Sequence, residues 1–549
     1  MRHPDVSRTA NPPSRPQFPF AEPPAQRERS EPRYDTVAAL GTELRMRDGV
    51  TLFADVFRPY ARGERFPALI AFSPYTRLLQ SSNLPLGQNE AGITEFWVPR
   101  GYAHVIVEAR GTGDSEGRYD LLGAAEQRDL CETIEWVAQQ PWCDGNVGMV
   151  GCSYFAMTQL LAAMHRPPSL KAIFPYDGAT DLYREFYTRG GAPTSLWFSW
   201  LSQVAGLNIR GSRVPDPSGI VEHARTHLRH EHPLYDDYWR ERVAEPRLQD
   251  IDIPAYFGCE WSFQELHLRG AFEGWERTGA IPKRLLIGPK PEPYRIYSAY
   301  HGEALRWYDH WLKGLDTGIM EGDPIQLYIP GRDEWRGERE WPLARTEWQT
   351  LYLGGPGDGA AAGTLADEPG DDRSRSWRFD PHRHEVLAGQ PCLTYRSAPF
   401  ERDVEVTGPL ALHLHLASTA TDTDIYARVH DEAPDGSSRF LCKGALRASH
   451  RRQDPERSTP ERPYHDHLAE EPLEPGEVYE LALEIWPTSN VFAAGHRVRL
   501  EVASSDTAFL SIHGIVHQAP PVFLPDATNT VLEGRSHPSR LLLPTIPAA

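Results

Sequence analysis

The residues from 147 to 156 constrain the fold more than any other part of this sequence. They read VGMVGCSYFA, an apolar run that ends in Gly151-Cys152-Ser153 and passes into helical spacing. A Gly-x-Ser pattern between a strand and a helix is typical of a nucleophile elbow, where small residues allow a cramped turn. The pattern predicts that Ser153 is a nucleophile and that the amide of Tyr154 points into an oxyanion hole. Short patterns also occur by chance, so the neighbouring segments must support the interpretation.

Continuous apolar runs surround this stretch and alternate with helical patterns. Such runs are typical of strands that are buried on both faces of a parallel sheet. They occupy residues 66–72, 103–108, 170–175, 253–258 and 284–288, with helical patterns at 124–140 and 302–314 and a hairpin pattern at 42–59. The alternation predicts a doubly wound α/β domain, in which loops at the carboxyl ends of the strands build the active site.

Changes of pattern along the chain predict the other domains. Residues 1–35 are rich in Pro, Arg and Glu and are expected to form a disordered leader before an α/β domain made of residues 36–182 and 251–330. The aromatic-rich segment 183–250 reads as a helical cap inserted over the sheet. Short alternating runs within 341–549 predict a separate antiparallel β-sandwich or jelly roll.

Composition excludes several classes of function. The chain has 549 residues and a formal net charge of −19, which disfavours nucleic acid and anionic membranes as partners. Its six cysteines lack Cys-x-x-Cys spacing, so no metal site is predicted and reduced thiols in a cytoplasm are the simplest interpretation. We find neither the apolar core of a signal peptide nor a run of about 20 apolar residues that could span a membrane.

Taken together, these motifs resemble the cocaine-esterase and X-Pro dipeptidyl-peptidase family of serine hydrolases. The resemblance spans most of residues 42–549 and depends on the motifs at 46–52, 73–75, 109–117, 142–148, 151–154 and 311–314. It implies an α/β-hydrolase domain, a helical cap and a C-terminal jelly roll, with no cofactor. It also implies that Ser153 is the nucleophile and that the Tyr75 hydroxyl and the Tyr154 amide donate to the oxyanion.

The sequence departs from this family at the general base. Glu292 stands where the family usually has its histidine, and Phe263 stands near the place of the usual aspartate. A serine hydroxyl is a poor nucleophile until a base takes its proton, so another group must act. His267 lies just beyond the loop in which the family usually has its aspartate. Glu292 itself would act as the base if burial raised its pKa. His301 and Glu260 are the remaining candidates, and the sequence does not choose among them.

Two functional hypotheses follow. The first is a serine hydrolase that cleaves a small-molecule ester or amide, or transfers its acyl group, through an acyl-Ser153 intermediate. The second is a catalytically impaired homologue that binds an acyl or peptide-like ligand in the same pocket, because the usual base is replaced. The C-terminal domain also offers surface for a homodimer.

Overall fold

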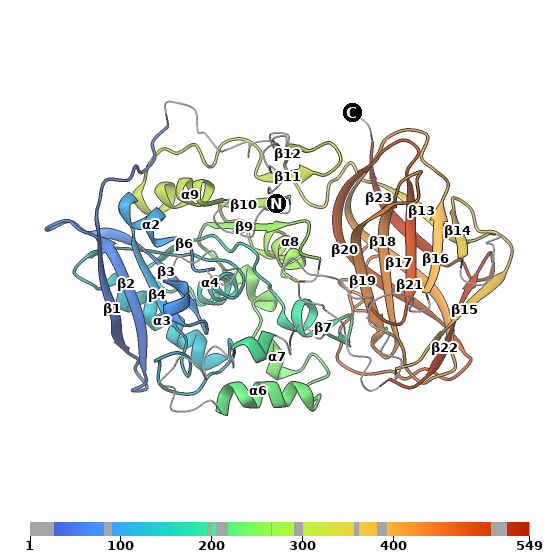
Figure 1. The fold of residues 1–549 in the computed structure, drawn as a ribbon, viewed down its shortest axis with the longest axis horizontal. Coiled ribbons are helices and arrows are strands. Elements are labelled where there is room, and N and C mark those ends of the chain that lie inside the picture. The colour runs from blue at the N-terminus through green and yellow to red at the C-terminus, as the bar shows by residue number, and fades with distance from the viewer. Residues whose placement is uncertain are drawn as a thin grey trace, which may run out of the picture.

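The structure is a computed structural model and describes residues 27–81, 90–194, 197, 200–204, 218–264, 266–289, 300–355, 362–381, 392–506 and 524–547. An α/β domain and an all-β domain lie side by side, with cap elements between and below them in the view of Figure 1. Within the described residues, no helix combines the length and the apolar character needed to cross a bilayer.

A ten-stranded sheet forms the centre of the α/β domain. Its order is β1-β2-β4-β3-β5-β6-β9-β10-β11-β12. From β4 to β11 neighbouring strands run parallel, and the flanking pairs are antiparallel. The strands are β1 (Thr36–Arg45), β2 (Thr51–Pro59), β3 (Phe66–Ser73), β4 (Ala103–Glu108), β5 (Cys143–Met149), β6 (Leu170–Ile173), β9 (Ala255–Glu260), β10 (Lys283–Gly288), β11 (Ile325–Ile329) and β12 (Glu334–Glu338).

Both faces of this sheet are covered, which explains the continuous apolar runs. Along β3, Ala68 and Ile70 pack into one core and Leu69 and Ala71 into the other, because successive strand residues point to opposite faces. Helices α3 (Ala124–Ala138), α4 (Tyr154–Met164) and α8 (Leu268–Arg277) contribute residues to the first core. Helices α2 (Thr94–Trp97) and α9 (His301–Lys313), with Phe155 of α4, contribute residues to the second. The predicted doubly wound α/β fold is therefore confirmed.

The segment predicted as a cap contains short elements held by aromatic packing. These are the π-helical turn η2 (Tyr183–Tyr187), β7 (Thr188–Arg189), β8 (Ala192–Pro193), α6 (Ser218–Leu228), α7 (Asp237–Glu241) and η3 (Glu245–Asp250). The ring of Tyr187 stacks on Trp239 with centroids 4.5 Å apart, and Trp197 packs edge-on against both. Rings of this size bury a large apolar area, so they can order a segment that has little regular structure.

The C-terminal domain is all-β, as predicted, and its sheet closes on itself. Eleven strands form one sheet, and β17 (Val404–Ser418) also pairs with β23 (Arg540–Ile546). The β17–β20 register shifts between Gly408 and Leu410, and such irregularities let a long strand bend enough to close a sheet. The domain is therefore barrel-like rather than two separate sheets. Its remaining strands are β13 (Glu347–Gly354), β14 (Ala362–Ala366), β15 (Arg373–Phe379), β16 (Cys392–Ser397), β18 (Asp424–Glu432), β19 (Ser438–Arg447), β20 (Val478–Phe492), β21 (Arg497–Ala503) and β22 (Ala527–Glu533).

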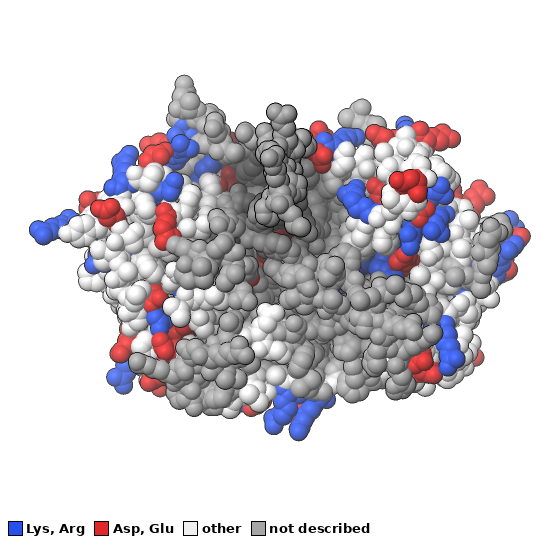
Figure 2. Space-filling model, in the orientation of Figure 1, with Lys and Arg blue, Asp and Glu red and all other residues white. Residues whose placement is uncertain are grey.

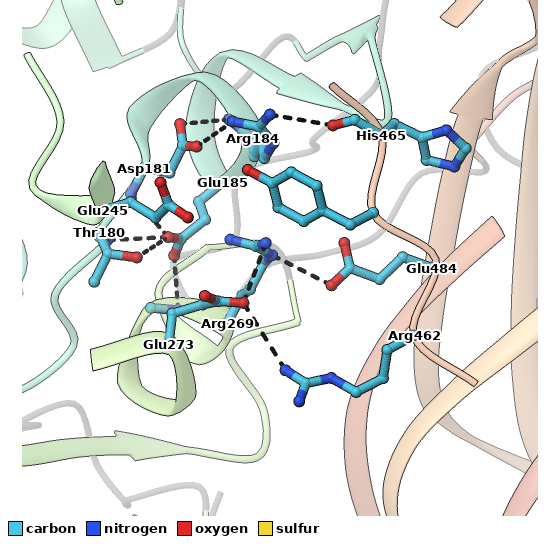
Figure 3. Close-up of polar contacts among 12 residues, drawn as sticks. Thr180, Asp181, Arg184, Glu185, Glu245, Arg269, Glu273, Arg462, His465 and Glu484 are labelled. Atoms are coloured by element: carbon cyan, nitrogen blue, oxygen red, sulfur yellow. Dashed lines mark hydrogen bonds and ion pairs between the residues drawn. The ribbon is translucent and has the colours of Figure 1, made fainter. Parts of the chain in front are cut away.

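A buried ion network joins the two domains (Figure 3). Arg269 of α8 is 3% exposed and lies 3.3 Å from Glu273 on its own helix and 3.3 Å from Glu484 of β20. Arg184 of η2 pairs with Asp181 at 2.6 Å and donates a hydrogen bond to the His465 carbonyl of the β domain at 3.1 Å. The β domain therefore braces α8 and the start of the cap.

We predict that Arg269→Met lowers the free energy of unfolding by about 3 kcal/mol, because removing one partner of a buried pair leaves uncompensated charge. Urea denaturation followed by circular dichroism measures the change. The matched control is Arg240→Met, whose arginine pairs with Asp237 at the surface and should leave the curve unchanged. Equal effects of the two substitutions would contradict the stabilising role of the network.

Candidate active site

Ser153 sits on a sharp turn between β5 and α4. Its backbone has φ 59° and ψ −121°, a conformation that residues other than glycine rarely adopt. Neighbouring segments hold the turn in place: the Ser153 amide donates to the Tyr176 carbonyl at 3.2 Å, and the Cys152 amide donates to the Glu90 carbonyl at 3.1 Å. Strained residues persist only where the surroundings determine their conformation, and they cluster at functional sites.

Gly151 makes this turn sterically feasible. Its φ is 115°, and an added Cβ would lie 2.6 Å from the Cβ of Phe155 and 2.8 Å from the Glu90 carbonyl oxygen. The usual elbow pattern has glycine two residues after the nucleophile, whereas this chain has Phe155 there. The missing side chain of Gly151 leaves the room that Phe155 needs.

Tyr75 meets Ser153 from the loop that follows β3. The Tyr75 hydroxyl lies close enough to the Ser153 side chain to interact with it, and it accepts a hydrogen bond of 2.9 Å from Trp200 Nε1 in the cap. Burial raises the pKa of Tyr75 well above its ordinary value, so the phenol stays neutral and keeps its proton to donate. The structure thus brings together the two side chains that the sequence singled out.

Tyr154 can contribute to the site through its backbone. Its side-chain hydroxyl donates to Glu126 at 2.6 Å, and its ring stacks on Trp200 with centroids 5.9 Å apart. The residue begins α4, and amides in the first turn of a helix have no carbonyl partner within that helix. The Tyr154 amide is therefore positioned to donate to an oxyanion, as the elbow pattern predicts.

The candidate bases predicted from the sequence lie in different surroundings. Glu292 lies outside the described residues. His267 precedes α8, is 2% exposed, has φ 73° and packs its ring edge-on against Phe263 at 5.5 Å. Its role as base stays a prediction. Phe263 itself is buried and cannot replace the carboxylate of an aspartate.

His301 and Glu260 have more clearly defined surroundings. The His301 ring stacks on Phe96 at 4.7 Å and packs against Trp97 at 5.6 Å, and burial lowers its pKa to about 3. An imidazole with so low a pKa is a weak base, so the geometry disfavours His301. Glu260 ends β9 and is fully buried, where it accepts a hydrogen bond from the Ser262 hydroxyl at 2.9 Å.

Sequence reasoning missed two carboxyls at the elbow, those of Glu90 and Asp177. Asp177 follows Tyr176, the residue whose carbonyl accepts the Ser153 amide, and Glu90 supplies the carbonyl that holds Cys152. A signal existed for Asp177, because it lies just past the carboxyl end of β6, the edge at which active sites form in such sheets. Glu90 lies in a polar loop whose sequence shows no comparable signal.

A doubly wound sheet with a serine at its elbow and an attached all-β domain defines a serine hydrolase of the α/β-hydrolase class. Two family models match the chain: "X-Pro dipeptidyl-peptidase (S15 family)" over residues 48–291 and "X-Pro dipeptidyl-peptidase C-terminal non-catalytic domain" over residues 317–542. The chain belongs to the cocaine-esterase and X-Pro dipeptidyl-peptidase family of serine hydrolases.

Individual relatives can be aligned with this chain over most of its length. The cocaine esterase of Rhodococcus sp. (strain MB1 Bresler) is 29% identical, with 91% of this chain and 97% of that protein aligned. A putative Xaa-Pro dipeptidyl-peptidase of Streptomyces avermitilis is 24% identical, covering 84% of this chain and 77% of that protein. A CocE/NonD family hydrolase structure from Staphylococcus aureus superposes with a TM-score of 0.81 at 24% identity, covering 93% of this chain and 94% of that one.

These comparisons support the first of the two functional hypotheses. The protein is a serine hydrolase of the X-Pro dipeptidyl-peptidase and cocaine-esterase type, and the non-hydrolytic alternative is not favoured. The roles of individual residues depend on the geometry of the site.

We predict that Trp200→Phe lowers kcat/KM for a p-nitrophenyl ester about fivefold, because the lost indole N–H fixes the phenol of Tyr75 and one such hydrogen bond contributes about 1 kcal/mol. Steady-state kinetics measures the effect. Trp142→Phe is the matched control, since Trp142 lies at the opposite end of β5 from Ser153. Identical kinetics for the two variants would show that the indole does not position Tyr75.

Proposed function

We propose that this enzyme hydrolyses a small-molecule ester or amide with Ser153 as its nucleophile. The hydroxyl of Tyr75 and the amide of Tyr154 hold the oxyanion. The contact between the Tyr75 hydroxyl and the Ser153 side chain at the strained turn is the observation that carries this proposal. Few structural needs would explain such a pair, whereas acyl transfer requires a nucleophile beside a preorganised donor.

The chemistry follows from this arrangement. Ser153 Oγ loses its proton to a base and bonds to the carbonyl carbon, and the π electrons of the carbonyl move to its oxygen. Tyr75 and the Tyr154 amide donate hydrogen bonds to that oxyanion. Collapse of the tetrahedral intermediate expels the leaving group with a proton from the base, and water then releases the acyl group by the reverse sequence.

The surroundings favour a substrate with an apolar or aromatic acyl group. Phe155 packs against Tyr75 with centroids 5.9 Å apart, and Trp200 packs against Phe186 at 5.4 Å. The name of the Rhodococcus relative, a cocaine esterase, supports an ester. On the face drawn in Figure 2, acidic and basic side chains of the described residues are interspersed, which supports a small uncharged substrate over nucleic acid.

Location and assembly remain proposals. All six cysteines are unpaired in the structure, which supports a reducing compartment such as the cytoplasm. The expected homodimer stays a prediction.

We predict that a fluorophosphonate probe labels the wild-type enzyme covalently and that Ser153→Ala abolishes the labelling. Tyr75→Phe should keep the fold and lower the rate of labelling about 10²–10³-fold, the cost of losing one oxyanion donor. Mass spectrometry locates the adduct, and thermal unfolding checks that each variant is folded. A folded wild type that resists the probe, or labelling that survives Ser153→Ala, would sink the proposal.

A further inference from the structure

Backbone pairing places Asp177 beside the nucleophile. Tyr176 forms parallel bridges to Cys152 on one side and to Gly258 on the other, so the chain segments that carry Ser153, Asp177 and Cys259 lie next to one another. The Asp177 amide donates to the Gly258 carbonyl at 2.8 Å, and its backbone has φ 53°. A strained backbone recurs here one residue after the carbonyl that accepts the Ser153 amide.

Glu90 approaches the same turn from another segment. Its carbonyl accepts the Cys152 amide, and its own amide donates to Gln80 Oε1 at 2.9 Å. His104 of β4 orders the segment that follows Glu90, because its two ring nitrogens lie 3.0 Å from the Ala91 carbonyl and 3.0 Å from the Thr94 hydroxyl. The Glu90 carboxyl interacts electrostatically with both Tyr75 and Asp177. One carboxyl therefore faces the oxyanion tyrosine and the second carboxyl.

Three of the four oxygens of these two carboxyls, Oε2 of Glu90 and both oxygens of Asp177, are buried without a hydrogen-bond partner among the described residues. The thiol of Cys259 lies near Asp177 but donates to the Glu260 carbonyl at 3.7 Å. Desolvation therefore raises the pKa of Glu90 to about 8 and that of Asp177 well above its ordinary value. The titratable groups facing the pair are Tyr75, Cys152, Tyr176, Cys259, Glu260 and Tyr300.

A structural carboxyl at similar depth shows the contrast. Glu185 is as deeply buried as Asp177, yet it accepts hydrogen bonds from the amides of Thr180 and Asp181 and from the amide of Gly270. Buried carboxylates are normally satisfied in this way. The unsatisfied pair at the elbow costs stability, and such a cost is typical of groups that exchange protons during a reaction.

We propose that Glu90 and Asp177 together form the general base that takes the proton of Ser153. This inference rests on the proposed role of Ser153 as nucleophile. The ionised carboxylate of the pair accepts the proton while Ser153 Oγ bonds to the carbonyl carbon, and the partner carboxyl keeps its own proton. The pair then gives the transferred proton to the leaving group, and in the second half it takes one from water and returns it to Ser153. Two carboxyls that share protons titrate as a unit.

The test compares acylation rates of full-length variants across pH, with the fluorophosphonate probe and with a p-nitrophenyl ester. Glu90→Gln and Asp177→Asn should each lower the rate about 10²–10⁴-fold, the usual contribution of a general base. The wild-type rate should rise with pH to a plateau with an apparent pKa near 8, because the base acts only when ionised. His267→Ala, His301→Ala and Glu292→Gln are the comparison variants and should retain that profile.

Separate outcomes overturn separate claims. Wild-type rates in both carboxamide variants, or a loss confined to His267→Ala or Glu292→Gln, would refute the carboxyl pair and leave Ser153 as nucleophile. A wild type that never reacts would refute the proposed function itself. If the carboxamide variants do not fold, the pH dependence of the wild-type acylation rate still distinguishes the two kinds of base, because an apparent pKa near 6.5 would indicate a histidine. Recovery of Glu90→Ala by added formate would support the pair.

Discussion

The strained turn at Ser153 is the constraint on which the site depends. Three segments fix it: Gly151 admits the close approach of Phe155, Tyr176 accepts the Ser153 amide and Glu90 accepts the Cys152 amide. Each contact requires that the ends of parallel strands meet at one edge of the sheet. Tyr75 after β3, Ser153 after β5 and Asp177 after β6 therefore converge although more than a hundred residues separate the first from the last.

The β domain contributes to this convergence from a distance. Glu185 ties the amides of Thr180 and Asp181 to Gly270 of α8, and Arg269 of the same helix pairs with Glu484 of β20. The loop that begins at Asp177 is thus pinned to a helix that the second domain braces. A domain without a residue in the chemistry can still hold the site in shape, since positioning depends on surrounding contacts.

The sequence predicted the sheet and the elbow because short stretches of neighbouring residues determine both. Continuous apolar runs mark strands with two covered faces, and the Gly-x-Ser turn marks Ser153. Closure of the β domain could not be predicted from the sequence, because it depends on the pairing of β17 with β23, two strands that lie far apart along the chain. The general base could not be chosen from the sequence for a related reason: His267 and Glu292 were named for their places along the chain, whereas the contact of Glu90 with Cys152 exists only in three dimensions.

We expect Ser153, in its strained turn beside Tyr75, to become acylated during turnover. The most direct measurement is rapid-quench mass spectrometry of the enzyme mixed with p-nitrophenyl acetate. We predict a transient acetyl group on the peptide that carries Ser153, formed and lost at the rate of turnover. An acetyl group on Cys152 or another side chain instead, or hydrolysis without any covalent intermediate, would contradict it.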